Sequence, residues 1–158
     1  MQVIITLRPY GKERQVERME VELVLDGVQR EAGEELCAMQ LSTVTIPGCT
    51  PEAFQVSDGE GEVPTESFCS EPYPLVLLHE KVKRKTSGTI KIQYTVRPRI
   101  LDKKDICGPY FDFRCEDGGA NSAGISFLPQ IEGIRGKAIL HWDMSRMPEG
   151  SRGVSTFG

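Results

Sequence analysis

The chain has 158 residues, of which 39% are hydrophobic and 27% are charged, and this is the composition of an ordinary globular protein. The length predicts a single domain, residues 1–158, with enough chain to bury a core without disulfides or metals. The formal net charge of −4 gives no reason to expect a nucleic-acid partner. No apolar run approaches the roughly 18 residues of a membrane-spanning helix, so we expect no membrane partner either.

Apolar and polar residues alternate along most of the chain, which is the period of β-strands that bury one face. The first candidate strand is Val3–Leu7, and residues 19–26 follow with apolar residues at alternate positions. The clearest strand is residues 90–97, where Ile90, Ile92 and Tyr94 alternate with polar residues. The shorter candidates are Leu36–Val44, Leu75–Val82, Tyr110–Cys115, Ile125–Leu128 and Ala138–Trp142.

Glycine- and proline-containing turns separate these runs, and no stretch keeps a helical period. Gln29–Cys37 is the best helix candidate, and it is short and interrupted by glycine. Thr50–Pro74 is polar, acidic and proline-bearing, and predicts a long connection with one strand around Phe54–Val56. We therefore predict an all-β fold: an antiparallel β-sandwich, immunoglobulin-like or related, with little helix.

Charge is distributed unevenly along the chain. Pro51–Glu71 carries six acids and no lysine or arginine, whereas Lys81–Lys104 carries nine bases and a single acid. Two interpretations stay open: a basic strip that binds an acidic partner, or the solvated faces of two strands opposite the acidic segment.

The five cysteines are an odd number, so at least one thiol is unpaired, and no two of them have the C-x-x-C spacing. Met1 leads directly into a strand-like run, without the pattern of a signal peptide. We expect free thiols in a reducing cytoplasm.

The stretch "GPYFDFRCEDGGANSAGISFLP", residues 108–129, is the strongest candidate for a site, because acids and an amide surround a glycine-rich centre between aromatic residues. A simple connection between two strands is the favoured interpretation. A ligand-binding rim and a metal site are the alternatives, although the D-x-[DN]-x-[DN]-G rhythm of a calcium loop is absent. The possible rim residues are Asp117, Gly118, Gly119, Asn121 and Phe127.

Alternation in the strand before this loop places Asp112 and Arg114 on one face, while Phe113 and Cys115 face the core. The loop itself is too irregular to predict a phosphate-binding cradle.

Only two histidines are present, His79 and His141. In "LLHEKVK" the second histidine of an H-E-x-x-H zinc motif is replaced by Lys83, so we expect His79 to be structural or exposed. His141 is expected on the outer face of its strand, with Trp142 packed inward. No G-x-S-x-G nucleophile motif occurs, so we predict no catalytic residue, metal or cofactor in this chain.

Three stretches stand out together: "STVTIPGCTPEAFQV" (residues 42–56), "GTIKIQYTVRPRI" (residues 88–100), and "ISFLPQ" followed by "KAILHWDMSRMPEGSRGVSTFG" (residues 125–130 and 137–158). They resemble the amino-terminal β-domain of gluzincin metallopeptidases, especially the glycyl-aminopeptidase-like group. The resemblance implies an all-β domain that precedes a zinc peptidase domain. The zinc-binding helix has no counterpart here, so no metal or catalytic residue is implied for this chain.

Arg152–Gly158 resembles the start of another strand, which predicts that the chain is the amino-terminal piece of a longer protein. Our first hypothesis is a non-catalytic domain that packs on the following peptidase domain and shapes access to its active site. The second is a free-standing module that binds peptide or carbohydrate at a sheet edge or at the glycine-rich loop. A small enzyme built around His141 is the third and least favoured.

Overall fold

The computed structural model describes residues 2–13, 15–43, 49–102, 112–116, 118–134 and 136–156. These residues form strands joined by turns, with a single turn of 3-10 helix and no α-helix among them. The strands are β1 (Gln2–Lys12), β2 (Gln15–Asp26), β3 (Glu35–Thr43), β4 (Glu52–Asp58), β5 (Gly61–Glu62), β6 (Thr65–Ser70), β7 (Leu75–Val82), β8 (Ile90–Val96), β9 (Arg99–Ile100), β10 (Arg114–Glu116), β11 (Gly119–Asn121) and β12 (Lys137–Trp142), and the 3-10 turn η1 is Gly124–Ser126.

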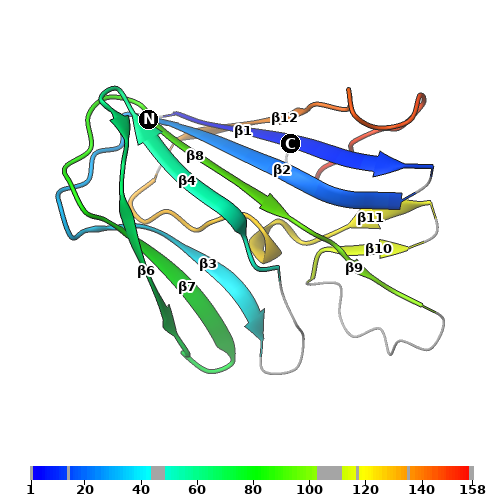
Figure 1. Cartoon of the computed structure of the whole chain (residues 1–158), viewed down its shortest axis with the longest axis horizontal. Helices are drawn as coiled ribbons and strands as arrows, with labels where there is room; N and C mark the ends of the chain where they lie inside the picture. The colour runs from blue at the N-terminus through cyan, green and yellow to red at the C-terminus, as the bar shows by residue number, and fades with distance from the viewer. Residues whose placement is uncertain are drawn as a thin grey trace.

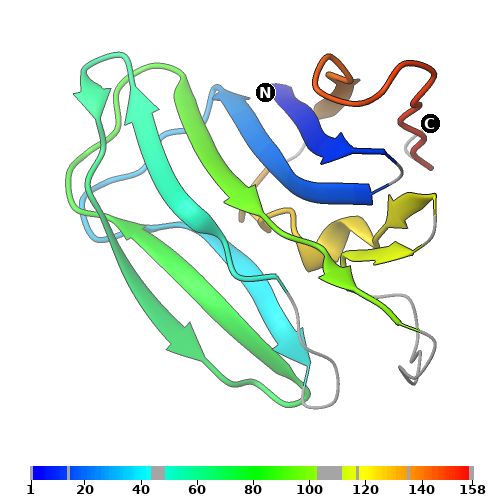
Figure 2. The ribbon, with the colours of Figure 1, turned by 45° about the vertical axis from the view of Figure 1, so that its right-hand side comes forward.

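The strands make three sheets (Figure 1). A six-stranded sheet has the order β12-β1-β2-β8-β4-β5, and two three-stranded sheets have the orders β3-β7-β6 and β11-β10-β9. Figure 2 shows the two smaller sheets side by side beneath the large one. The pairing is antiparallel except for β1 with β12 and β10 with β9. The prediction of an all-β sandwich with little helix is confirmed.

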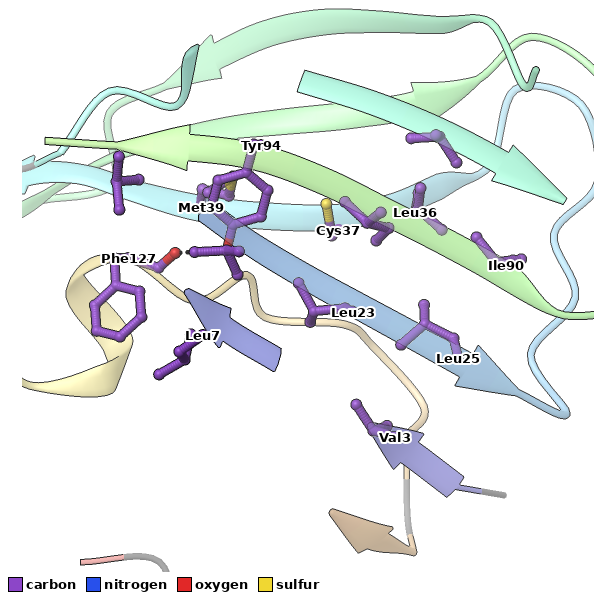
Figure 3. Close-up of a cluster of buried hydrophobic side chains, with 14 of the residues drawn as sticks. Val3, Leu7, Leu23, Leu25, Leu36, Cys37, Met39, Ile90, Tyr94 and Phe127 are labelled. Carbon is purple, nitrogen blue, oxygen red and sulfur yellow. Dashed lines mark hydrogen bonds between the residues drawn. The ribbon is translucent and has the colours of Figure 1, made fainter. Parts of the chain in front are cut away.

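The core lies between the large sheet and the β3-β7-β6 sheet (Figure 3). Alternate residues of β2 and β8 point into it, which is why the period-two pattern of these strands is so regular. The fully buried residues include Leu25, Ile90, Ile92 and Val96 from the large sheet and Leu36 from β3. Among the described residues no helix is long and apolar enough to cross a membrane.

Tyr94 connects this core to the loop after β11. Its ring is 3% exposed and stacks on Phe54, and its hydroxyl donates a 2.7 Å hydrogen bond to the Phe127 carbonyl oxygen. Figure 3 shows this bond between the sheet and the η1 region. Burial raises the pKa of Tyr94 well above its ordinary value, so the phenol stays a donor.

At two places the structure supports the second interpretation of the uneven charge, in which bases of residues 81–104 lie opposite acids of residues 51–71. Asp58 at the end of β4 accepts hydrogen bonds of 2.7 and 2.8 Å from the Arg84 guanidinium, and Glu52 accepts one of 3.0 Å from Arg97. At these two places, bases of the later segment therefore pair with acids of the earlier one.

Two sequence predictions of local structure are wrong. Gln29–Cys37 is a turn followed by the start of β3, because Gly33 takes the left-handed conformation at φ 86° and Leu36 enters the core. Ile125–Leu128 does not continue a strand. The chain bends through η1, where the amide of Leu128 donates to the Gly124 carbonyl at 2.8 Å, and this bend carries Phe127 inward.

Two further predictions need correction. Thr50–Pro74 contains three strands rather than one, because its prolines fall outside the strands: Pro51 precedes β4, Pro64 lies between β5 and β6, and Pro72 and Pro74 follow β6. Residues 152–156 form no strand.

Candidate functional site

An apolar groove with a volume of about 740 Å³ lies at one end of the large sheet. Its walls come from β1, β2 and β12, from the loop around η1, and from the segment of residues 143–156 that follows β12. Figure 2 shows this C-terminal segment beside the ends of β1 and β11. The groove joins parts of the chain that are more than a hundred residues apart.

The register of β1, β2 and β12 explains which residues of the large sheet line the groove. Leu7 of β1 pairs with Trp142 of β12, and Pro9 pairs with Met19 of β2. Alternation then aims Leu140 and Trp142 at the same side of β12. The residues that line this wall are Leu7, Pro9, Val16, Met19, Leu140 and Trp142. Because they are almost all apolar, the wall offers van der Waals contact and few hydrogen bonds.

The C-terminal segment lies directly on the ring of Trp142. A Cβ atom placed on Gly153 would be 2.1 Å from Cδ2 of that indole, so only glycine allows so close an approach. The segment is tied down by a 2.9 Å hydrogen bond from the Asp143 amide to the Leu7 carbonyl and by an ion pair of 3.0 Å between Arg146 and Glu20. It also contributes Met144 and Met147 to the groove.

One polar group among the groove residues has no hydrogen-bond partner in the described part of the chain. The indole Nε1 of Trp142 is buried and donates no hydrogen bond within the described part of the protein. A buried donor without an acceptor costs free energy comparable to a lost hydrogen bond.

The sequence-predicted rim residues lie near the groove but do not all line it. Gly118, Asn121 and Phe127 contribute to the lining, whereas Gly119 is exposed in β11 and does not. Asp117 lies outside the described residues. The glycine-rich stretch is a hairpin in which Glu116 pairs with Gly119, and this is the strand connection that the sequence favoured.

Asp112 stabilises the structure through its contacts with two arginines. It is 2% exposed and accepts hydrogen bonds from Arg99 (2.8 Å) and from the fully buried Arg114 (2.6 Å). Burial by itself would raise the pKa of Asp112, but the two guanidinium groups outweigh it and hold the pKa below its ordinary value. The carboxylate therefore joins β9 to β10. Phe113 and Cys115 are buried as predicted, and Asp112 and Arg114 are buried as well.

The histidines lie apart from the groove. His141 is exposed on β12 while Trp142 lines the groove, which confirms the predicted orientation of the strand. His79 is half-buried on β7, between Glu35 and Ser70. Among the described residues no three His, Cys, Asp or Glu side chains are grouped closely enough to hold a metal ion.

Sequence patterns miss two features of this arrangement. Met144 and Met147 belong to an irregular segment, where no periodicity indicates which side chains point inward. The partners of His79 come from two neighbouring strands, β3 and β6, so no local motif connects them.

No protein-family model and no curated protein matches the chain. Among solved structures, the chain is similar to a mutant of a two-domain M1 zinc metallopeptidase bound to L-tryptophan, with 16% sequence identity and a TM-score of 0.40. The alignment covers 82% of this chain and 28% of that protein. A TM-score this low does not establish a shared fold.

Proposed function

We propose that the chain is a non-catalytic amino-terminal β-sandwich domain of a longer, peptidase-like protein. Its groove face packs on a following zinc peptidase domain and shapes access to that domain's active site. The observation that supports the packing is the open apolar groove of about 740 Å³. The peptidase class comes from the resemblance of residues 42–56, 88–100, 125–130 and 137–158.

A following domain of the same polypeptide would be tethered beside the groove, because residues 151–156 line it. A domain tethered there is held at a high effective concentration, and a modest apolar contact is enough to dock it. Interfaces between domains of one chain typically bury about 600–1,500 Å².

The lining suits a protein surface. Three methionines, Met19, Met144 and Met147, provide flexible, polarizable contacts that adapt to a partner's side chains. The rim residues Gly118, Asn121 and Phe127 belong to the same face.

A binding assay between residues 1–158 and the separately expressed region that follows in the same gene tests the proposal. Val154→Glu adds a charge to the groove at a residue that is 84% exposed, so it leaves folding intact. We expect it to weaken association at least about tenfold, or roughly 1.4 kcal/mol. The matched control is Ile100→Glu, which adds the same charge at an apolar residue that is 64% exposed and outside the groove.

Equal binding by both variants would contradict docking at the groove. A stop codon directly after Gly158, or a following region without H-E-x-x-H, would contradict the peptidase proposal.

The second candidate is a free-standing peptide-binding module. The groove volume falls within the roughly 300–1,000 Å³ of small-ligand sites, and its apolar lining favours a hydrophobic peptide over a carbohydrate. Titration of a short apolar peptide would shift the fluorescence of Trp142, and a matched oligosaccharide would not.

A further inference from the structure

Three side chains from three strands form a continuous hydrogen-bonded line on the β3-β7-β6 sheet. Ser70 Oγ of β6 is 2.7 Å from Nε2 of His79 on β7, and Nδ1 of the same ring is 2.8 Å from Oε2 of Glu35 on β3. The groove residues take no part in this cluster. It has the connectivity of a nucleophile, a base and a carboxylate that orients the base.

The register of the sheet explains why the three residues meet. His79 lies opposite Phe68 on β6, and Ser70 follows two residues later on the same face. On β3 a bulge between Glu35 and Cys37 adds one residue, so that Glu35 pairs with Lys81. The bulge turns Glu35 to the face of His79, while Leu36 and Cys37 point into the core.

The carboxylate decides which ring nitrogen carries the proton. An ionised glutamate only accepts hydrogen bonds, so Nδ1 of His79 is the donor to Glu35. Nε2 of the neutral ring then has a free lone pair and accepts the hydroxyl proton of Ser70. This is the tautomer that a general base needs in order to activate a serine.

The surroundings hold the ring and leave the serine within reach of solvent. Phe68 stacks on His79 with a centroid distance of 4.6 Å and an interplanar angle of 8°, and Lys81 Nζ lies 4.8 Å from the Phe68 centroid. The His79 side chain is 14% exposed, and Ser70 is half-buried. Phe68 is itself 39% exposed, so it offers an apolar surface beside Ser70 to a small acyl or aryl group.

We propose that Ser70 is a nucleophile that accepts acyl groups from small uncharged esters, an activity beyond the non-catalytic role of the groove. Ser70 Oγ attacks the ester carbonyl carbon while His79 Nε2 takes the hydroxyl proton. The C–O bond to the alcohol then breaks as His79 returns that proton to the leaving oxygen. Water hydrolyses acyl-Ser70 by the same route and releases the carboxylic acid. Glu35 is a positioning residue that fixes the tautomer of His79.

Covalent labelling with an alkyl fluorophosphonate, followed by peptide mass spectrometry, tests this proposal. The probe phosphonylates activated serines and releases fluoride. A general base typically contributes a factor of about 10²–10⁴, so we expect Ser70 to be labelled at least about 100-fold faster than in His79→Ala. Hydrolysis of p-nitrophenyl acetate should fall in parallel in Ser70→Ala.

The same strand offers a matched control. Ser67 of β6 donates a 2.7 Å hydrogen bond to Glu80 Oε1, so it has a carboxylate partner but no histidine. In the unmodified protein Ser70 should be labelled about 100-fold faster than Ser67, a comparison that requires no variant to fold. Ser67→Ala should leave ester hydrolysis unchanged.

The tautomer of His79 separates positioning from a merely structural role. Imidazole nitrogen-15 NMR should place the ring proton on Nδ1 in the unmodified protein. In Glu35→Gln both tautomers should appear and labelling of Ser70 should slow, because an amide no longer fixes the ring proton at Nδ1. Equal labelling of Ser70 and Ser67, or a Ser70 rate that does not depend on His79 in a folded variant, would overturn the proposal.

Discussion

Replacing Gly153 with alanine tests whether the C-terminal segment covers Trp142. The new Cβ would lie 2.1 Å from Cδ2 of the indole, about 1.4 Å closer than the shortest favourable carbon–carbon contact. If ring and segment both stayed in place, this overpacking would cost about 1–3 kcal/mol. Lifting the segment instead would expose one ring face, roughly 60 Å², at a cost of about 1.5 kcal/mol. The free-energy costs of overpacking and of exposing the ring face are similar. Because a surface segment moves more easily than a strand, we expect the segment to lift away from the ring.

We therefore expect Gly153→Ala to reduce the free energy of unfolding by about 1–2 kcal/mol and to expose the indole. The chain contains a single tryptophan, so the emission maximum and acrylamide quenching report on Trp142 alone. Emission should shift to the red and quenching should increase.

Gly119→Ala is the control for this experiment, because no atom lies within 4 Å of a Cβ placed there. Unchanged emission in Gly153→Ala, or an equal shift in Gly119→Ala, would refute the proposed contact.

Three further predictions concern single side chains. Tyr94→Phe removes the donor to the Phe127 carbonyl and should cost about 1–2 kcal/mol in urea denaturation, and a loss near zero would show that water replaces the hydroxyl. Hydrogen bonds from Arg84 hold the pKa of Asp58 below its ordinary value of 3.8, so the stability they supply is present above that pH and is lost as the pH falls below it. Asp58→Asn should thus be less stable than the native chain at pH 7, with a gap that narrows below pH 4; a gap independent of pH would contradict this linkage. Maleimide should modify the exposed Cys69 in the folded protein, as read by peptide mass spectrometry, and protection of that thiol would place β6 differently.

The fold class was predictable because alternation is a local property. The pattern in residues 90–97 requires one buried face, and Ile90, Ile92 and Tyr94 are indeed buried in β8. Elements with weak or misleading local signals were not predictable. The sequence of Gln29–Cys37 permits a helix. The segment forms a turn and the start of a strand because β3 pairs with β7.

The candidate site was predictable only in part. Local turn chemistry identifies the glycine-rich hairpin, and Gly118 takes φ 96° at its turn. Alternation also places Trp142 inward. The groove itself depends on the irregular segment after β12, whose position follows from contacts with Leu7 and Glu20, more than a hundred residues earlier in the chain.

The sequence by itself therefore determined the all-β class and, for regularly alternating strands such as β2 and β8, which side is apolar, because these depend on neighbours along the chain. The tertiary structure alone decided which strands lie side by side and which polar groups meet. The line of Ser70, His79 and Glu35 illustrates the difference, because one extra residue in the β3 bulge sets the face on which Glu35 lies. A shift of one residue reverses every side chain of a strand, and only the pairing of distant strands fixes that register.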